Sequence, residues 1–137
     1  AVANSIVPKF TFMVGNSYGA GNYAMCGKGY DPRLIYAWPT AEIAVMGGKQ
    51  ASETLLAIKT QQMEKEGKHI SKEEQQKLLK DIQARYDHET DPYFAAARLW
   101  VDGIIDPVET RSIVSMGIAM AANNANIPPF NPGVIQM

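Results

Sequence analysis

Residues 9–25 read KFTFMVGNSYGAGNYAM, and this stretch decides the fold class. The segment Lys9–Val14 has the aromatic and β-branched composition of a strand. It runs into the glycine-rich stretch Gly15–Met25, which precedes a predicted helix. A strand that feeds a helix through a glycine turn is typical of α/β layered proteins, so we predict an α/β fold.

The pattern repeats further along the chain. Two more strands are predicted, at Leu34–Trp38 and Ile43–Met46. Gly47 and Gly48 end the second of them, and a helix is predicted at Gln50–Ile58. The apolar residues of that helix fall on one face: Ala51, Leu55 and Ile58.

Charge is concentrated between Lys59 and Glu89, where seven basic and seven acidic residues lie. Within this stretch Ser71 and Glu74 have the spacing of a capping box, which begins a helix. A buried apolar stripe is expected at Leu78, Leu79, Ile82 and Tyr86. Ion pairs are expected between Glu73 and Lys77 and between Asp81 and Arg85. We predict a surface helix laid on the body and favour a solvated face over a docking surface.

The last part of the chain is apolar and helical. A short helix is predicted to open at Asp91 and run through Arg98. A second helix begins at Pro107, since proline is tolerated in a first turn. Its apolar face, predicted to be core, contains Ile113, Met116, Gly117 and Met120. The tail, Pro128–Met137, is predicted to be extended.

Length and composition narrow the class of protein. The 137 residues, 46% hydrophobic and 20% charged, are enough for one compact globular domain. The net charge of −1 argues against nucleic-acid and anionic-membrane partners. The sequence has no apolar run of membrane-spanning length and no signal-peptide pattern at its start, and the missing initiator Met favours a chain cut from a longer one. The single cysteine, Cys26, excludes an internal disulfide and favours a reducing compartment.

The glycine-rich stretch is the candidate site. Small residues let the backbone approach a ligand, and adjacent amides at a helix start can form an oxyanion hole. Phosphate binding is the second possibility, although neither phosphate-loop spacing fits. A turn that needs glycine for its shape alone is equally compatible with the sequence.

Other reactive groups favour structural roles. His69 and His88 are predicted on a solvated helix surface, and no metal site is expected because they lack partners at ligand spacing. Cys26 is predicted to be a buried thiol. Asp102 and Asp106 flank a turn and an edge strand rather than forming an acid–base pair.

Three segments together resemble a known family. Residues 15–25, residues 38–48, and residues 97–107 with Thr110 and Arg111 are similar to the carboxyltransferase (β) subunits of biotin-dependent acyl-CoA carboxylases. The resemblance implies a crotonase-like fold, in which ββα units stack into a superhelix and each subunit has two such domains. Residues 1–137 would be the C-terminal portion of the second domain, with a charged helical insertion at about 59–89.

The resemblance also implies a reaction and a site. Such subunits move a carboxyl group from carboxybiotin, tethered to a carrier domain, to an acyl-CoA, and no metal is involved at this site. The backbone amides of Ala20 and Gly21 would hold the oxygen of the biotin enolate. The residues implied to bind biotin or substrate are Tyr18, Gly19, Asn22, Tyr23, Gly47 and Gly48. The chain alone is expected to transfer no carboxyl group, because half of the family's site lies on a missing domain.

Subtype and partners follow from the same resemblance. Gly21–Met25 matches methylcrotonoyl-type relatives, and Tyr23 replaces the acidic residue of propionyl-type members. Propionyl- or geranoyl-CoA carboxylases, a biotin-dependent decarboxylase and a non-catalytic oligomerisation fragment remain alternatives. Expected partners are the rest of the same subunit, further copies in a hexamer-type homo-oligomer, and a biotin carboxylase and biotin carrier subunit. The expected location is the bacterial cytoplasm or the mitochondrial matrix.

Overall fold

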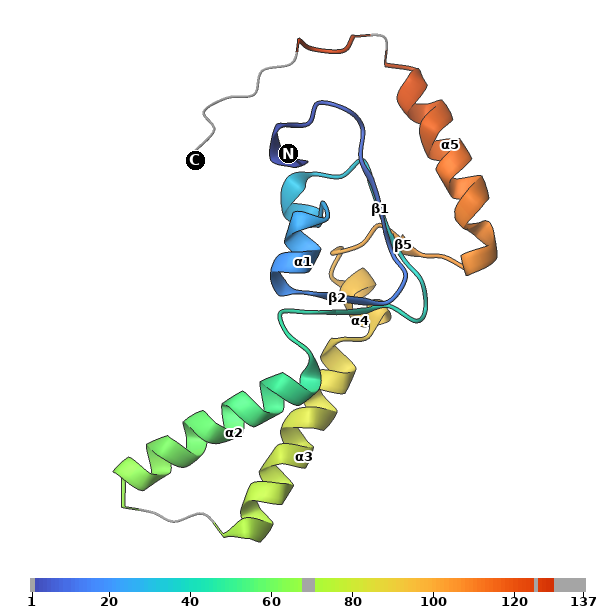
Figure 1. Cartoon of the computed structure of the whole chain (residues 1–137). Coiled ribbons are helices and arrows are strands. Elements are labelled where there is room, and N and C mark those ends of the chain that lie inside the picture. The colour runs from blue at the N-terminus through green and yellow to red at the C-terminus, as the bar shows by residue number, and fades with distance from the viewer. Residues whose placement is uncertain (1, 68–70, 125, 130–137) are drawn as a thin grey trace.

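The computed structural model describes residues 2–67, 71–124 and 126–129, and its first half repeats one arrangement twice (Figure 1). In each repeat two strands lead into a helix: β1 (Phe10–Met13), β2 (Asn16–Tyr18) and α1 (Gly19–Ala24), then β3 (Leu34–Ala37), β4 (Glu42–Ala44) and α2 (Gly48–Lys65). These are two ββα units, and they confirm the predicted α/β class.

The remaining elements complete the chain. They are the 3₁₀ helices η1 (Val2–Asn4), η2 (Lys28–Tyr30) and η3 (Pro107–Glu109), the helices α3 (Lys72–Glu89), α4 (Pro92–Ala97) and α5 (Thr110–Ala122), and the strand β5 (Gly103–Ile104). The short helix predicted after Asp91 is α4. The predicted tail lies largely outside the described residues.

Equivalent strands of the two units pair with each other in parallel. One sheet has the order β1-β3-β5, and a second sheet pairs β2 with β4. The registers place Phe10 beside Leu34 and Asn16 beside Glu42. Sequence reasoning missed β2 because its residues, Asn16–Tyr18, are polar and lie within the glycine-rich stretch. It also placed the third strand too late, since β4 ends at Ala44 and Val45 is 77% exposed.

The core lies where the strands meet α4. It consists of apolar side chains, most of them small or branched. The buried residues are Met13, Ile35, Ala37, Ala41, Ile43, Ala95 and Val101. Two backbone hydrogen bonds lie at the corner between the sheets. The Trp38 amide donates to the Met13 carbonyl (2.9 Å), and the Glu42 amide donates to the Gly15 carbonyl (3.3 Å).

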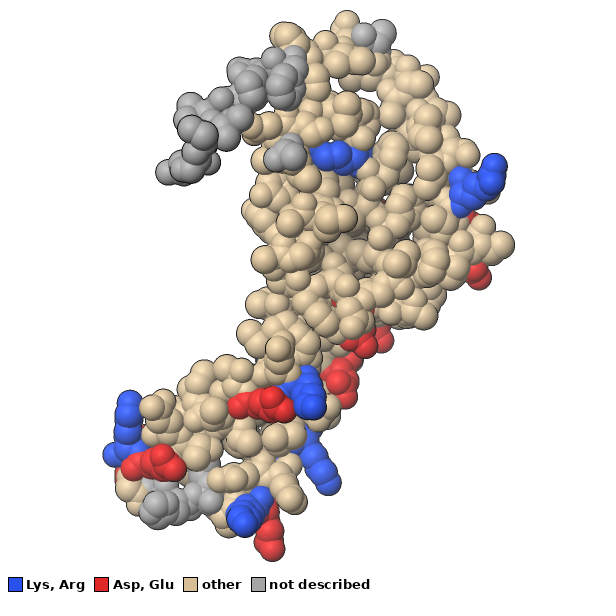
Figure 2. Space-filling view, viewed as in Figure 1, with Lys and Arg blue, Asp and Glu red and all other residues tan. Residues whose placement is uncertain are grey.

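The charged stretch forms a hairpin rather than a layer on the body. Helix α2 continues past Ile58 to Lys65, so the predicted helix end was wrong, and α3 packs antiparallel against α2 (Figure 1). The hairpin projects away from the sheets, which corrects the prediction that α3 lies on the body. Figure 2 shows most of the charge on this face gathered over the hairpin, while the body is largely uncharged.

Details of the hairpin differ from prediction in burial and in pairing. The predicted stripe on α3 is half-buried, and among the described elements α2 is the one that α3 contacts most. Leu55 and Ile58 of α2 are 41% and 56% exposed. Arg85 Nε pairs with Glu89 Oε1 at 2.8 Å instead of with Asp81. The Ser71–Glu74 capping box is confirmed.

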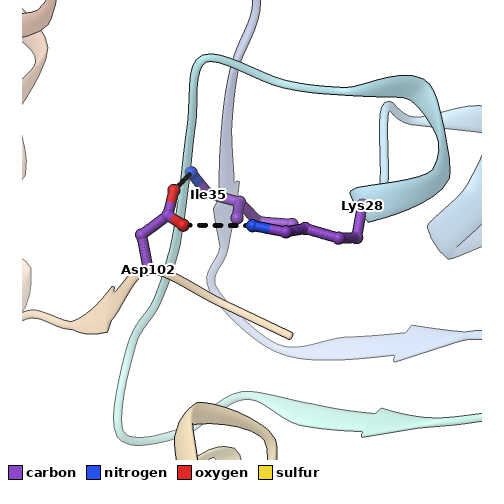
Figure 3. Close-up of polar contacts among 3 residues, drawn as sticks. All are labelled: Lys28, Ile35 and Asp102. Carbon is purple, nitrogen blue, oxygen red and sulfur yellow. Dashed lines mark hydrogen bonds and ion pairs between the residues drawn. The ribbon is translucent and has the colours of Figure 1, made fainter. Parts of the chain in front are cut away.

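Asp102 joins distant parts of the body (Figure 3). Its Oδ2 accepts a hydrogen bond from the Ile35 amide at 2.9 Å, and its Oδ1 lies 3.1 Å from Lys28 Nζ. The residue therefore ties η2 and the start of β5 to the central strand. This geometry supports the structural role predicted for Asp102.

Helix α5 packs on the sheet at one point. A Cβ on Gly117 would lie 3.2 Å from Leu34 Cδ1 and 3.3 Å from the Phe10 ring, so only glycine allows this approach without a shift. Met116 and Met120, predicted to be core, are 57% and 48% exposed. That prediction was wrong because only one narrow stripe of α5 meets the sheet.

Candidate functional site

The start of helix α1 presents unpaired backbone donors. Tyr18 is its N-cap residue, and no side chain caps the helix. Ala20 and Gly21 stand at its second and third positions, where an amide has no partner four residues earlier. Both residues are exposed, and a Cβ on Gly21 would have no neighbour within 4 Å. The backbone at Ala20 and Gly21 is therefore accessible, and its role as an oxyanion hole stays a prediction.

The turn into α1 depends on Gly19. Its φ is +48°, and a Cβ there would lie 2.6 Å from the carbonyl oxygen of Val45. Both the left-handed backbone and the contact exclude a larger residue. The same turn brings the segment after β4 against the start of α1.

Tyr18 contacts the second unit through its side chain. Its hydroxyl donates a hydrogen bond to Glu42 Oε2 on β4. The bond to the carboxylate, followed by partial burial, raises the pKa of Tyr18 to about 12. The phenol is thus neutral at physiological pH and is a hydrogen-bond donor, not a base.

The two glycines after β4 have different surroundings. Gly47 is the N-cap of α2, also without a capping side chain, and its Cβ position lies 3.6 Å from the Tyr18 ring. Gly48 faces Tyr86 and Asp87 of α3. Only Gly47 therefore contacts another of the predicted binding residues.

Asn22 and Tyr23 contact different neighbours of α1. The Asn22 amide nitrogen donates to Ser17 Oγ at 2.8 Å, so it braces the helix against β2. Tyr23 packs against Tyr30, with ring centroids 4.7 Å apart, and is 54% exposed. Tyr23 shares an open groove with Ala20, whereas Asn22 lines a separate cleft.

That cleft adjoins the turn that starts α1. It has a volume of about 320 Å³ and lies between α1, β4, the end of α3 and α4. Its walls are mainly apolar and include Val45, Phe94 and Trp100, with Gly19 at one edge. The cleft therefore places an apolar cavity beside the turn that starts α1.

A family model described as the carboxyl transferase domain matches residues 1–134. The chain belongs to this family. This carboxyltransferase segment is 50% identical over 125 residues to the probable mitochondrial methylcrotonoyl-CoA carboxylase β chain of Drosophila melanogaster, covering 91% of the segment and 22% of the relative. It is 43% identical over 137 residues to the biotin-dependent 3-methylcrotonyl-coenzyme A carboxylase β1 subunit of Mycobacterium tuberculosis, covering 100% of the segment and 26% of the relative.

Solved structures agree on the fold. The carboxyltransferase segment superposes on transcarboxylase 12S, a hexamer solved with methylmalonyl-coenzyme A bound, with a TM-score of 0.78 at 28% identity. The match covers 98% of the segment and 24% of that chain. The crotonase-like fold and the membership of an enzyme family of carboxyltransferases are thereby confirmed. The segment spans about a quarter of the length of the relatives it matches.

Other candidate groups of the carboxyltransferase segment lie outside this site. Cys26 is buried, as predicted, and Asp106 caps η3 through the Val108 amide. His88 is exposed and contacts the Phe94 ring edge-on, whereas His69 lies outside the described residues. No cluster of three or more His, Cys, Asp or Glu residues able to hold a metal is found in the part of the chain that the structure describes. Its described helices include none long and apolar enough to cross a membrane.

Sequence reasoning missed Glu42 and Val45, which both bear on the start of α1. Each lies in a motif that carried the resemblance, but neither was selected, because the contacts depend on the parallel pairing of β2 with β4. A predicted register for that pair was the only signal that could have found them.

Proposed function

We propose that the chain is the C-terminal portion of a carboxyltransferase subunit of a biotin-dependent acyl-CoA carboxylase, and that methylcrotonoyl-CoA is its acyl-CoA. The observation that carries this proposal is the uncapped start of α1, formed by the same stretch that resembles the family's site. The named relatives, which include two methylcrotonoyl-type β chains, support the choice of substrate.

The backbone of α1 supplies the electrostatic part of the reaction. Carboxybiotin, when bound, would supply the carboxyl group that is transferred. The amides of Ala20 and Gly21 would hold the ureido oxygen of biotin, where negative charge develops, and the positive end of the helix dipole would add to their effect. The open side of Gly21 lets a planar ring approach the backbone closely. This assignment needs no side-chain base at the start of α1. The neutral phenol of Tyr18, whose pKa is raised to about 12, is consistent with it.

The remaining predicted residues surround this pair of donors. Gly19 sets the turn, Gly47 and Gly48 open α2, and Asn22 holds α1 in place. Tyr23 lies in the groove beside Ala20, where it is positioned to influence which acyl chain is accepted. Substitution of Tyr23 is therefore expected to change substrate preference more than decarboxylation of carboxybiotin.

The exposed apolar surface of the segment supports the proposal that it binds other protein chains and the rest of its own subunit. Large apolar side chains lie in the open on several elements, among them Val45, Leu99, Trp100 and Met116. Such side chains are typical of surfaces that pack against other protein. We assign them to the rest of the same subunit and to further copies in a homo-oligomer, which acts with a biotin carboxylase and biotin carrier subunit in the bacterial cytoplasm or the mitochondrial matrix.

The test uses Gly21→Pro in the full-length subunit assembled with its biotin-bearing partner. Proline deletes one donor, so the turnover of methylcrotonoyl-CoA should fall by about a hundredfold, equivalent to roughly 3 kcal/mol. Gly21→Ala keeps the amide and has room for its methyl group, and Ala20→Ser also keeps its amide. Both should therefore be far milder.

Folding and binding must be separated from catalysis in this test. Circular dichroism and the Kd for acyl-CoA should match the wild type in all three variants. If a folded Gly21→Pro enzyme turns over at a near-normal rate, the α1 amides do not hold the reacting oxygen, and the glycines serve shape alone.

A further inference from the structure

Two side chains join the turns that begin α1 and α2. Tyr18 ends β2, and Glu42 begins β4, which pairs with β2 in parallel. The register sets Glu42 beside Asn16, so Glu42 and Tyr18 are diagonal neighbours on one face of the two-stranded sheet. The Tyr18 hydroxyl donates to Glu42 Oε2, and the ring of Tyr18 lies beside Gly47.

The backbone of Tyr18 governs where the α1 amides point. Tyr18 is the N-cap residue, with φ −116° and ψ 139°, and the next residue, Gly19, turns sharply with φ +48°. No side chain caps α1, and the side-chain hydrogen bond that holds its first turn, from Asn22 to Ser17 Oγ at 2.8 Å, comes from β2, the strand that Tyr18 ends. Any shift of Tyr18 is therefore passed directly to the amides of Ala20 and Gly21.

The anchor for Tyr18 lies on the other ββα unit. Glu42 is exposed, but its neighbour Ile43 is buried in the core, and the Ile43 amide bonds to the Thr90 carbonyl at 2.9 Å. Strand β4 is thus a fixed point against which the hydroxyl of Tyr18 is held. The carboxylate also keeps the phenol protonated, so the bond persists throughout the neutral range.

We propose that Glu42 is a positioning residue, which orients the amide pair of α1 through its hydrogen bond with the Tyr18 hydroxyl. The inference rests on the proposed function, because it concerns the same donors. Glu42 and Tyr18 touch no reacting atom in this assignment. They keep the donors in the direction that the developing oxyanion requires.

The variants separate the bond from the charge. In the full-length subunit with its biotin-bearing partner, Tyr18→Phe and Glu42→Ala should each lower kcat roughly tenfold, less than the loss of a donor outright, with an unchanged KM for methylcrotonoyl-CoA. The double variant should be no slower than the slower single variant, since both break one bond. Glu42→Gln keeps an acceptor for the hydroxyl and should recover most of the activity lost in Glu42→Ala.

Each other outcome overturns the inference. A raised KM with an unchanged kcat would make Tyr18 a substrate contact, and additive effects, or a Glu42→Gln variant as slow as Glu42→Ala, would exclude action through the shared bond. If Gly21→Pro is inactive while Tyr18→Phe and Glu42→Ala are normal, the positioning role is wrong and the proposed function stands. If Gly21→Pro is also normal, the proposed function falls with it. Circular dichroism spectra of Tyr18→Phe and Glu42→Ala that match the wild type exclude misfolding as the cause of a lower kcat.

Discussion

The starts of α1 and α3 solve the same physical problem in opposite ways. Each helix begins with amides that have no partner within the helix. At α3 the hydroxyl of Ser71 accepts from the Glu74 amide at 3.2 Å, and the Glu74 carboxylate accepts from the Ser71 amide at 3.0 Å. At α1 no side chain does this, and the chain places Gly19 and Gly21 there instead.

The difference separates helix-start amides that bond to side chains of their own turn from those that are left open. The start of α3 is closed by residues within one turn, so it stabilises the hairpin without help from the body. The start of α1 is held from outside, by the Val45 carbonyl against Gly19 and by Glu42 through Tyr18. A helix start that is supported from a distance and left open at its tip is suited to binding an anionic oxygen.

The largest loss of stability is expected when a glycine with positive φ is replaced, and each region has one: Gly19 at the start of α1 and Gly67 in the hairpin. Gly19→Ala should destabilise the fold around α1 by about 3 kcal/mol or more, because left-handed strain adds to overlap with Val45. Gly67 has φ +73° but no atom within 4 Å of a Cβ, so Gly67→Ala should cost only about 1 kcal/mol of hairpin stability. Hydrogen exchange of α1 and α2 amides in the full-length protein measures both.

The expected difference is contradicted if Gly19→Ala and Gly67→Ala lower stability by the same amount. Equal losses would mean that the Val45 carbonyl moves aside at little expense. The start of α1 would then be adaptable rather than held from outside.

A smaller effect is expected where a remote carboxylate satisfies a strand amide. Asp102→Ala leaves the amide of the fully buried Ile35 without its acceptor, and should lower the stability of the body by about 1–3 kcal/mol. Asp102→Asn keeps an acceptor and loses only the partly exposed ion pair with Lys28, so it should cost less than about 1 kcal/mol. Thermal unfolding and exchange of β3 amides distinguish the two.

Lys28→Met is the matched control for the ion pair and should resemble Asp102→Asn. If Asp102→Asn proves as harmful as Asp102→Ala, the charge of Asp102 matters more than its bond to Ile35.

The smallest effect is expected at the capped helix. Ser71→Ala removes the acceptor for the Glu74 amide and should weaken the start of α3 by about 1 kcal/mol. Amide exchange should rise in the first turn of α3 and stay unchanged in α1. Faster exchange in α1 would show that the two regions are coupled, against the view that α3 is closed locally.

The cap should also depend on pH. Hydrogen bonds from the amide and hydroxyl of Ser71 hold the pKa of Glu74 below its ordinary value of 4.5. A lowered folded-state pKa means that this stabilisation is present above the unfolded-state value and is lost as pH falls through the folded-state value. The difference in α3 exchange between the wild type and Glu74→Gln should therefore shrink as pH falls below the ordinary value of 4.5, and should vanish once Glu74 is protonated in the folded state.

Local patterns in the sequence determined much of this protein. The strands at β1 and β3, the capping box of α3, the short helix after Asp91 and the presence of a glycine turn before α1 depend on neighbours in the chain. Each was predictable because backbone preference and capping act over a few residues. The resemblance added the family, which the matched domain confirms.

Tertiary structure decided what joins distant residues. The polar strand β2 exists only because β4 pairs with it, and the bond between Tyr18 and Glu42 follows from that register. The sequence did not predict that the hairpin projects from the body or that the methionines of α5 remain exposed. Apolar periodicity shows that a helix has an apolar face, but it does not show what covers that face. Local sequence therefore specified the open start of α1, and the packing of the second ββα unit specified what holds it in place.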